Sequence, residues 1–189
     1  ERPGKTAVEM FQALETGEIK AIWIACTNPA QSLPDLPSVR RALEAATFVV
    51  LQDAYADTET AAFADLLLPA TTWGEKDGTV TNSERRISRL RAAVAKPFEA
   101  RHDWEIAVDF AQRLETRLRP GRPSLFAFDT AEALWNEHRE TTRGRDLDIT
   151  GLSWRILDQR GPQQWPFPAG AREGQVRLYA DGRFPTASG

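Results

Sequence analysis

The sequence predicts an α/β fold, in which a parallel, Rossmann-like sheet is flanked by helices and followed by an extended irregular C-terminal segment. Three short apolar runs indicate the strands, namely Lys20–Cys26, Thr47–Gln52 and Asp65–Ala70. Helical patterns separate these runs, and nearly continuous apolar strands are typical of a parallel sheet covered on both faces. From Arg143 onward the chain is rich in Gly, Pro, Gln and Trp, which favours a segment that wraps over a neighbour.

Helical signals accompany the strands in the first half. Thr6 and Glu9 have the spacing of a capping box, in which each side chain binds an otherwise unpaired amide. Val8, Phe11 and Leu14 then follow at helical spacing. The same signals predict two more helices, at Ser38–Ala46 and, with Asp57 as N-cap, at Asp57–Ala64.

The second half has a different character. Trp104–Leu118 carries apolar residues at four-residue steps and predicts an amphipathic helix. Asp129 and Glu132 suggest the capping box of a further helix, and Thr79–Arg89 predicts a pair of strands. We expect residues 1–120 to form the α/β domain and residues 121–189 a helix plus an extended linker.

The composition limits the classes of protein to which the chain can belong. The chain has 189 residues, 41% of them hydrophobic and 27% charged, which suits a globular fold with a core of its own. A net charge of −3 gives no field that favours nucleic acid or an acidic membrane surface. One cysteine excludes an internal disulfide and fits a reducing compartment, and no apolar run approaches the roughly 20 residues of a membrane span. Because no initiator Met is present, we expect a piece of a longer polypeptide.

The loops after the strands are the candidate binding site, because open parallel sheets bind ligands beyond the carboxyl ends of their strands. Asn28 offers an amide to a phosphate or a base edge, or forms an Asx-turn before Pro29. Asp53 can accept two hydrogen bonds, from ribose hydroxyls or from a guanine edge, or cap a turn. Lys76 can neutralise a pyrophosphate or be solvated, and Asp103 is by default a helix N-cap.

Other chemistry has little support in the sequence. The fingerprint G-x-G-x-x-G is absent, and no nucleophile elbow, P-loop or paired carboxylates stand out. His102 and His138 have no metal-type spacing with each other or with cysteine. Cys26 is interpreted as a buried structural thiol. The residues alone therefore predict a binding domain without a complete active site.

Three segments carry a family resemblance, namely "CTNPAQSLPD", "ADLLLPATTWGEKDGTVTNSERR" and "EARHDWEI". Together they resemble the bis-molybdopterin guanine dinucleotide oxidoreductases, the dimethyl sulfoxide reductase superfamily. Within it, "WGEKDGTVTNSERRIS", "RDLDITGL" and "PQQWPFP" are most similar to the assimilatory nitrate reductase catalytic subunits. The resemblance covers nearly the whole chain, from about Thr6 to the C-terminus.

The resemblance implies an internal α/β domain that holds the guanosine end of a bis-molybdopterin guanine dinucleotide cofactor. Carried over position by position, it assigns the cofactor contacts to Asn28, Gln52, Asp53, Lys76 and Asp103, with no catalytic residue and no metal ligand in this chain. Residues 1–120 would bind the cofactor, and residues 121–189 would lead toward a C-terminal barrel domain outside this sequence.

The same resemblance implies the rest of the enzyme. A 4Fe-4S cluster and the molybdenum ligand would lie upstream, and the whole cytoplasmic enzyme would reduce nitrate to nitrite. Its partners would be the remainder of the polypeptide and an electron-donor protein or reductase subunit, with neither nucleic acid nor membrane. Two alternatives stay open, the equivalent domain of a molybdenum formate dehydrogenase and a free-standing nucleotide-binding module without catalysis.

Overall fold

A computed structural model describes residues 3–188 of the chain. The chain divides into two compact units. Unit 1 comprises the residues up to Thr72 together with Lys96–Asp109, and unit 2 comprises Trp73–Ala95 together with the residues from Phe110 onward. Each unit has its own hydrophobic cluster and its own sheet.

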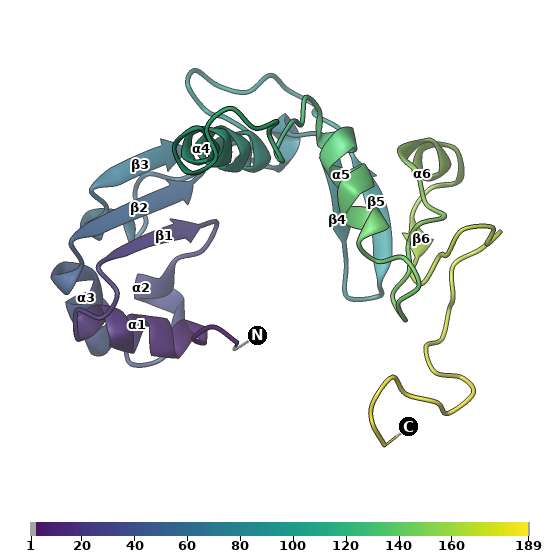
Figure 1. The fold of residues 1–189 in the computed structure, drawn as a ribbon, viewed down its shortest axis with the longest axis horizontal. Helices are drawn as coiled ribbons and strands as arrows, with labels where there is room; N and C mark the ends of the chain where they lie inside the picture. The colour runs from purple at the N-terminus through teal and green to yellow at the C-terminus, as the bar shows by residue number, and fades with distance from the viewer. Residues whose placement is uncertain (1–2, 189) are drawn as a thin grey trace. The chain divides into compact units, whose positions relative to one another are not determined.

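Unit 1 contains the predicted parallel sheet. Its strands are β1 (Ala21–Ala25), β2 (Phe48–Asp53) and β3 (Leu66–Pro69), in the order β1-β2-β3 (Figure 1). Both pairs are parallel, with Ile24 opposite Leu51 and Leu51 opposite Leu67. All three strands lie within one residue of the apolar runs that predicted them, so the α/β fold with a parallel sheet is confirmed.

The helices α1 (Ala7–Glu15), α2 (Pro29–Ser32) and α3 (Leu36–Ala45) accompany this sheet. The predicted capping box at the start of α1 is present, because Thr6 accepts from the amide of Glu9 while Glu9 accepts from the amide of Thr6. Side chains of α1 and α3 bury one sheet face in a single core that consists of Phe11, Leu14, Ile24, Ala30, Val39, Ala42, Leu43, Val49 and Leu51. Burial of that many apolar side chains is the dominant stabilisation of this unit.

Two expectations for unit 1 are corrected. The opposite sheet face leaves Phe48 and Leu66 exposed, so the cover predicted for both faces is incomplete in this unit. The helix predicted over Asp57–Ala64 is a single 3-10 turn, η1 (Ala61–Phe63), that follows Thr60. Thr60 is fully buried, and its hydroxyl donates a hydrogen bond to the side chain of Asn28. This long-range hydrogen bond is found instead of the expected N-cap at Asp57.

Unit 2 contains an antiparallel sheet. After a 3-10 turn, η2 (Trp73–Glu75), the strands β4 (Gly78–Thr81) and β5 (Arg86–Leu90) form the predicted hairpin. The two-residue strand β6 (Gln163–Gln164) pairs with β5, so the order is β4-β5-β6. The long helix α4 (Asp103–Leu118) begins in unit 1 and ends in unit 2.

Two shorter helices complete unit 2, α5 (Ala131–Glu140) and α6 (Trp154–Arg160). Thr130 caps α5, in place of the expected box led by Asp129, and Ser153 caps α6. α6 and the two-residue β6 are the regular elements of the otherwise irregular segment that follows Arg143, among the residues that the structure describes. Its apolar core consists of Ile87, Trp135, Ile149, Leu152, Leu157 and Phe167.

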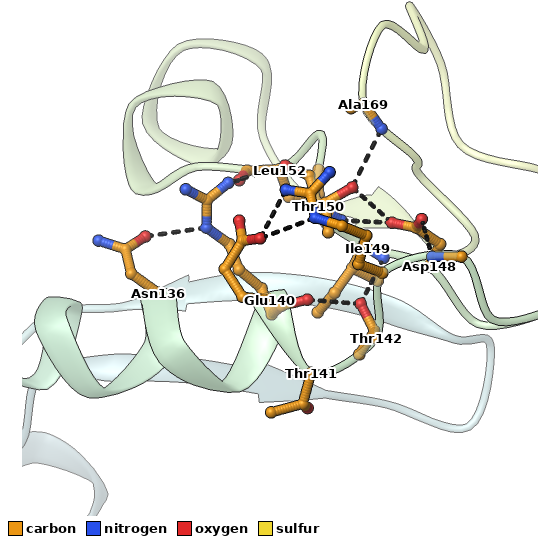
Figure 2. Close-up of polar contacts among 12 residues, drawn as sticks. Asn136, Glu140, Thr141, Thr142, Asp148, Ile149, Thr150, Leu152 and Ala169 are labelled. Atoms are coloured by element: carbon orange, nitrogen blue, oxygen red, sulfur yellow. Dashed lines mark hydrogen bonds and ion pairs between the residues drawn. The ribbon is translucent and has the colours of Figure 1, made fainter. Parts of the chain in front are cut away.

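Polar contacts fix the irregular backbone of unit 2 (Figure 2). Arg139 donates to the carbonyl oxygens of Thr150 (2.8 Å) and Leu152 (2.7 Å). Asp148 accepts hydrogen bonds from the amide and the hydroxyl of Thr150 and from the amide of Gly144. These hydrogen bonds lower the pKa of Asp148, and the one from the Thr150 hydroxyl has the largest effect. Side chains thus satisfy backbone groups that no helix or strand satisfies.

Candidate functional site at the carboxyl edge of the parallel sheet

The carboxyl ends of β1, β2 and β3 lie at one edge of the unit 1 sheet, since all three strands run in the same direction. The amide of Cys26 donates to the carbonyl of Gln52 at 2.9 Å, which continues the pairing one residue beyond β1. At β3, the amide of Arg101 donates to the carbonyl of Pro69 at 3.0 Å. The segment that leads into α4 is thereby attached to this edge. In open parallel sheets this is the edge at which ligands bind.

Two of the five predicted site residues, Gln52 and Asp103, meet directly. The amide nitrogen of Gln52 donates to Oδ1 of Asp103 at 2.9 Å, and the Sγ of Cys26 donates to the same oxygen at 3.1 Å. Gln52 is only 3% exposed, so its amide is committed to holding this carboxylate at the end of the sheet. We call Cys26, Gln52 and Asp103 the carboxylate cluster.

Asp103 is the first residue of α4 rather than its N-cap. The preceding residue, His102, serves as the cap, because its carbonyl accepts the amide of Ile106 (3.1 Å) and its amide donates to Glu105 Oε2 (3.1 Å). The imidazole of His102 lies 3.0 Å from the hydroxyl of the buried Thr71. Asp103 therefore sits in the first turn, where the helix dipole favours a negative charge.

Cys26 is exposed, and the prediction of a buried structural thiol is wrong. The residue has a φ of +57°, a left-handed conformation that turns the chain at the end of β1. The turn takes the side chain off the sheet face and brings it to Asp103. Nothing in the local sequence pattern signals that conformation.

Asn28 forms long-range side-chain contacts in place of the Asx-turn considered for it. Its side-chain oxygen accepts the amide (3.1 Å) and the hydroxyl (2.6 Å) of Thr60, and its nitrogen donates to Glu59 at 2.6 Å and to Gln31 at 3.2 Å. The hydrogen bond from Asn28 is the main cause that lowers the pKa of Glu59. Asn28 thus ties the loop after β1 to the turn that precedes η1.

Asp53 closes β2 with a tight turn. Its Oδ1 accepts the amide of Tyr55 at 3.0 Å, which is an Asx-turn, and its backbone carbonyl accepts the amide of Ala70 at 2.9 Å. A carboxylate oxygen has lone pairs in more than one direction, so a turn-forming Asp retains acceptor capacity for a ligand. Tyr55, an exposed aromatic side chain beside it, was not predicted as a site residue.

Lys76 belongs to unit 2, in the loop between η2 and β4. The other four predicted residues, Asn28, Gln52, Asp53 and Asp103, belong to unit 1 and lie at the carboxyl edge of its sheet. Among residues 3–188, no group of three or more His, Cys, Asp or Glu side chains is arranged to hold a metal ion. Within the same residues, every helix falls short of the length and apolar character that crossing a membrane requires.

Comparison with known proteins assigns the family. The class defined by the fold is an open α/β sheet with its polar groups gathered at the carboxyl edge. The family model described as Molybdopterin oxidoreductase matches residues 1–113, and this chain belongs to that family.

Relatives match almost the whole chain. It is 44% identical over 191 residues to a nitrate reductase of Synechocystis and 38% identical over 180 residues to the assimilatory nitrate reductase catalytic subunit of Bacillus subtilis. These matches cover 99% and 95% of this chain but only 26% and 24% of the relatives. An F420-dependent formate dehydrogenase subunit alpha of Methanocaldococcus jannaschii is 41% identical over 163 residues, covering 82% of this chain and 23% of the relative.

Among solved structures, acetylene hydratase from Pelobacter acetylenicus matches with a TM-score of 0.65 at 20% identity. The match covers 85% of this chain and 21% of that one, and it supports the fold alone. The chain thus spans about a quarter of the length of the curated relatives it matches.

Proposed function

We propose that this chain is the part of a molybdenum nitrate reductase that binds the guanosine end of a bis-molybdopterin guanine dinucleotide cofactor. One observation carries the proposal, namely that four of the five residues assigned to the cofactor gather at the carboxyl edge of one parallel sheet. Membership of the molybdopterin oxidoreductase family supports the pterin. When bound, molybdenum supplies the oxygen-atom transfer that reduces nitrate to nitrite.

The assigned residues divide into those proposed to contact the cofactor and those that hold other groups in position. Asp53 is assigned to the guanine or ribose of the cofactor and Lys76 to its phosphates. Gln52 is a positioning residue, because its buried amide holds Asp103. Asn28 would present the loop after β1 to the ligand while remaining bonded to Thr60.

The remainder of the enzyme belongs to the same proposal. A 4Fe-4S cluster, the molybdenum ligand and the catalytic residues would lie in parts of the polypeptide that this sequence does not include, and an electron-donor protein would supply the electrons. Residues 1–120 would bind the cofactor, and residues 121–189 would link it to a barrel domain. A cytoplasmic location fits the likeness to an assimilatory enzyme, and this chain alone is expected to be inactive.

Replacement of Asp53 by Ala in the whole protein tests the site. Loss of a charge-assisted hydrogen bond of about 1.5–3 kcal/mol should lower cofactor affinity roughly tenfold or more. The measurement is the guanine and molybdenum content of the purified protein. Asp57→Ala is the matched control, since Asp57 lies exposed in the same loop. Unchanged guanine and molybdenum contents in Asp53→Ala would rule out the proposed role of Asp53.

The likeness to a formate dehydrogenase subunit makes formate oxidation the second candidate activity. Assay of the whole protein with nitrate and a reduced artificial donor, and with formate and an artificial acceptor, separates the two. We expect nitrate reduction without formate oxidation. A protein that lacks both activities and carries no guanine cofactor would instead be a nucleotide-binding module without catalysis.

A further inference from the structure

The loop that carries Lys76 is held at both ends by hydrogen bonds within unit 2. On its N-terminal side, the carbonyl of Gly74 accepts the amides of residues 93 and 94, at 2.7 and 3.0 Å. On its C-terminal side, Gly78 is the first residue of β4 and lies opposite Leu90 of β5. The loop is thus attached to β5 and to the chain segment that follows β5.

The side chain of Arg89 adds two contacts at the C-terminal end of this loop. Its Nη2 donates to Oδ1 of Asp77 at 3.3 Å, and its Nη1 donates to the carbonyl of Gly78 at 3.1 Å. Asp77 and Gly78 directly follow Lys76 in the sequence. A guanidinium can bind both acceptors at once, because its donors lie in one rigid plane. Arg89 therefore fixes the two residues that follow Lys76.

Helix α6 holds Arg89 in its turn. The guanidinium lies 3.4 Å from the ring centre of Trp154, and the side chain of Arg89 is only 11% exposed. The Nε of Arg89 lies 3.9 Å from Oδ1 of Asp158, a carboxylate that also pairs with Arg91. Trp154 and Asp158 both belong to α6. A side chain that is already held by stacking and by ion pairs has little freedom left to lose when a ligand binds nearby.

We propose that Arg89 is a positioning residue for Lys76, and that α6 supports the phosphate contact of the cofactor through Arg89. The inference rests on the proposed function in one respect, the assignment of Lys76 to the phosphates. Arg89 acts through the loop, because its guanidinium is stacked on Trp154 and bonded to Asp77 and Gly78. A loop that is held in place before binding loses less conformational entropy on binding, so the affinity for phosphate rises. Residues 121–189 thus contribute to ligand binding in addition to forming a link.

Binding of guanosine diphosphate (GDP) and of guanosine to the cofactor-free whole protein tests the proposal, because guanosine lacks the phosphates. Isothermal titration calorimetry measures both affinities. Lys76→Met should weaken the binding of GDP about tenfold and leave that of guanosine unchanged. Asp77→Asn should weaken GDP about threefold, since the loop loses one of its side-chain anchors. Loss of a negative charge beside the phosphates would by itself strengthen GDP binding, so a weaker affinity in Asp77→Asn reports the position of the loop.

Two replacements of arginine by lysine give an independent readout. Arg89→Lys keeps the positive charge but cannot bind Asp77 and Gly78 together, so GDP affinity should fall about fivefold while guanosine affinity stays the same. Arg91→Lys is the matched control, because Arg91 is 60% exposed and pairs with α6, and it should change neither affinity. Hydrogen exchange at the amide of Phe167, which is bonded elsewhere in unit 2, should be equal in wild type and Arg89→Lys, showing that the unit stays folded.

The double variant Lys76→Met/Arg89→Lys should bind GDP no more weakly than Lys76→Met alone, because Arg89 acts through Lys76. Additive losses, or an unchanged GDP affinity in Arg89→Lys, would overturn the inference and leave the proposed function intact. Equal losses for GDP and guanosine in Arg89→Lys would overturn it as well, since Arg89 would then only stabilise the fold. If wild type bound GDP no better than guanosine, the proposed role of Lys76 would fail and the inference with it.

Discussion

Unit 1 and unit 2 place their arginines differently. Arg41 of unit 1 is 58% exposed and pairs with Glu15 across α3 and α1, outside the core. Arg89 of unit 2 is only 11% exposed, and its guanidinium lies 3.4 Å from the ring centre of Trp154. It also donates to the carbonyls of Gly78 and Leu90 and to Asp77. The guanidinium of Arg89 thus forms part of the interior of unit 2.

The difference follows from the backbone of each unit. In unit 1, the helices and the parallel sheet pair their own amides and carbonyls, so apolar side chains can fill the interior. Unit 2 has long irregular segments whose carbonyls need other donors, and Arg85 and Arg139 supply them. Arg89 donates to the carbonyls of Gly78 and Leu90, at the paired ends of β4 and β5. Arginine suits this role because it has five donors in a rigid plane and stacks on tryptophan. We therefore expect the stability of unit 1 to depend mainly on the volume of its buried apolar side chains. The stability of unit 2 should depend also on its arginine side chains.

The largest expected effect is in the core of unit 1. Leu51 is fully buried, and Leu51→Ala should reduce the free energy of unfolding by about 3–4 kcal/mol, through lost transfer free energy and a cavity. Denaturant unfolding of the chain, followed by circular dichroism, measures the change. Leu66→Ala on the exposed face is the control and should change stability far less. Similar losses from both replacements would mean that the described core does not stabilise the unit.

A smaller loss, about 2–3 kcal/mol, is expected for Arg89→Met, because the carbonyl of Gly78 loses its donor while Trp154 keeps a neighbour of similar length. Arg89→Lys should restore little of it, since one ammonium group cannot reach several acceptors. The matched variant in unit 1, Arg41→Met, should change the denaturation midpoint only slightly, as for exposed ion pairs in general. If Arg41→Met were as damaging as Arg89→Met, the contrast between the units would fail.

The smallest effect concerns Asp148 and depends on pH. Hydrogen bonds from Thr150 and Gly144 lower its pKa in the folded state, so its stabilisation is complete above the unfolded pKa of about 3.9 and is lost as the pH falls through the folded value. Asp148→Asn should therefore be less stable than the wild type at pH 7, and the difference should shrink below about pH 4. Thermal unfolding from pH 7 to pH 3 measures this. Asp129→Asn, an exposed position, controls for the change in net charge, and a difference independent of pH would show that the carboxylate charge is not involved.

Local patterns predicted the elements of unit 1 well, because their causes are local. The capping box of Thr6 and Glu9 acts over three residues, and the apolar runs of β1, β2 and β3 are each continuous in sequence. The contacts of the candidate site are not local. Asp103 lies 51 residues from Gln52 and 77 from Cys26, and Asn28 lies 32 residues from Thr60. Periodicity carries no information on such pairs, so their partners could not be predicted.

The segments "RDLDITGL" and "PQQWPFP" indicated the relationship to nitrate reductases, and the structure gives them a packing role. The amide of Phe167 donates to the carbonyl of Asp148 (2.7 Å), and the amide of Gly151 donates to the carbonyl of Phe167 (2.9 Å). A Cβ on Gly151 would lie 2.3 Å from the carbonyl oxygen of Pro168, so only glycine fits there. Phe167 is fully buried. Main-chain hydrogen bonds thus join the two segments within unit 2.

The carboxyl edge of the unit 1 sheet is proposed to bind the guanosine end of the cofactor. Hydrogen exchange of the whole protein, prepared with and without the guanine dinucleotide cofactor, tests it most directly. We predict that the loops at residues 26–28 and 53–57 exchange more slowly when the cofactor is bound, while residues 148–152 of unit 2 are unchanged. Equal exchange of these two loops in the loaded and empty proteins would contradict the claim.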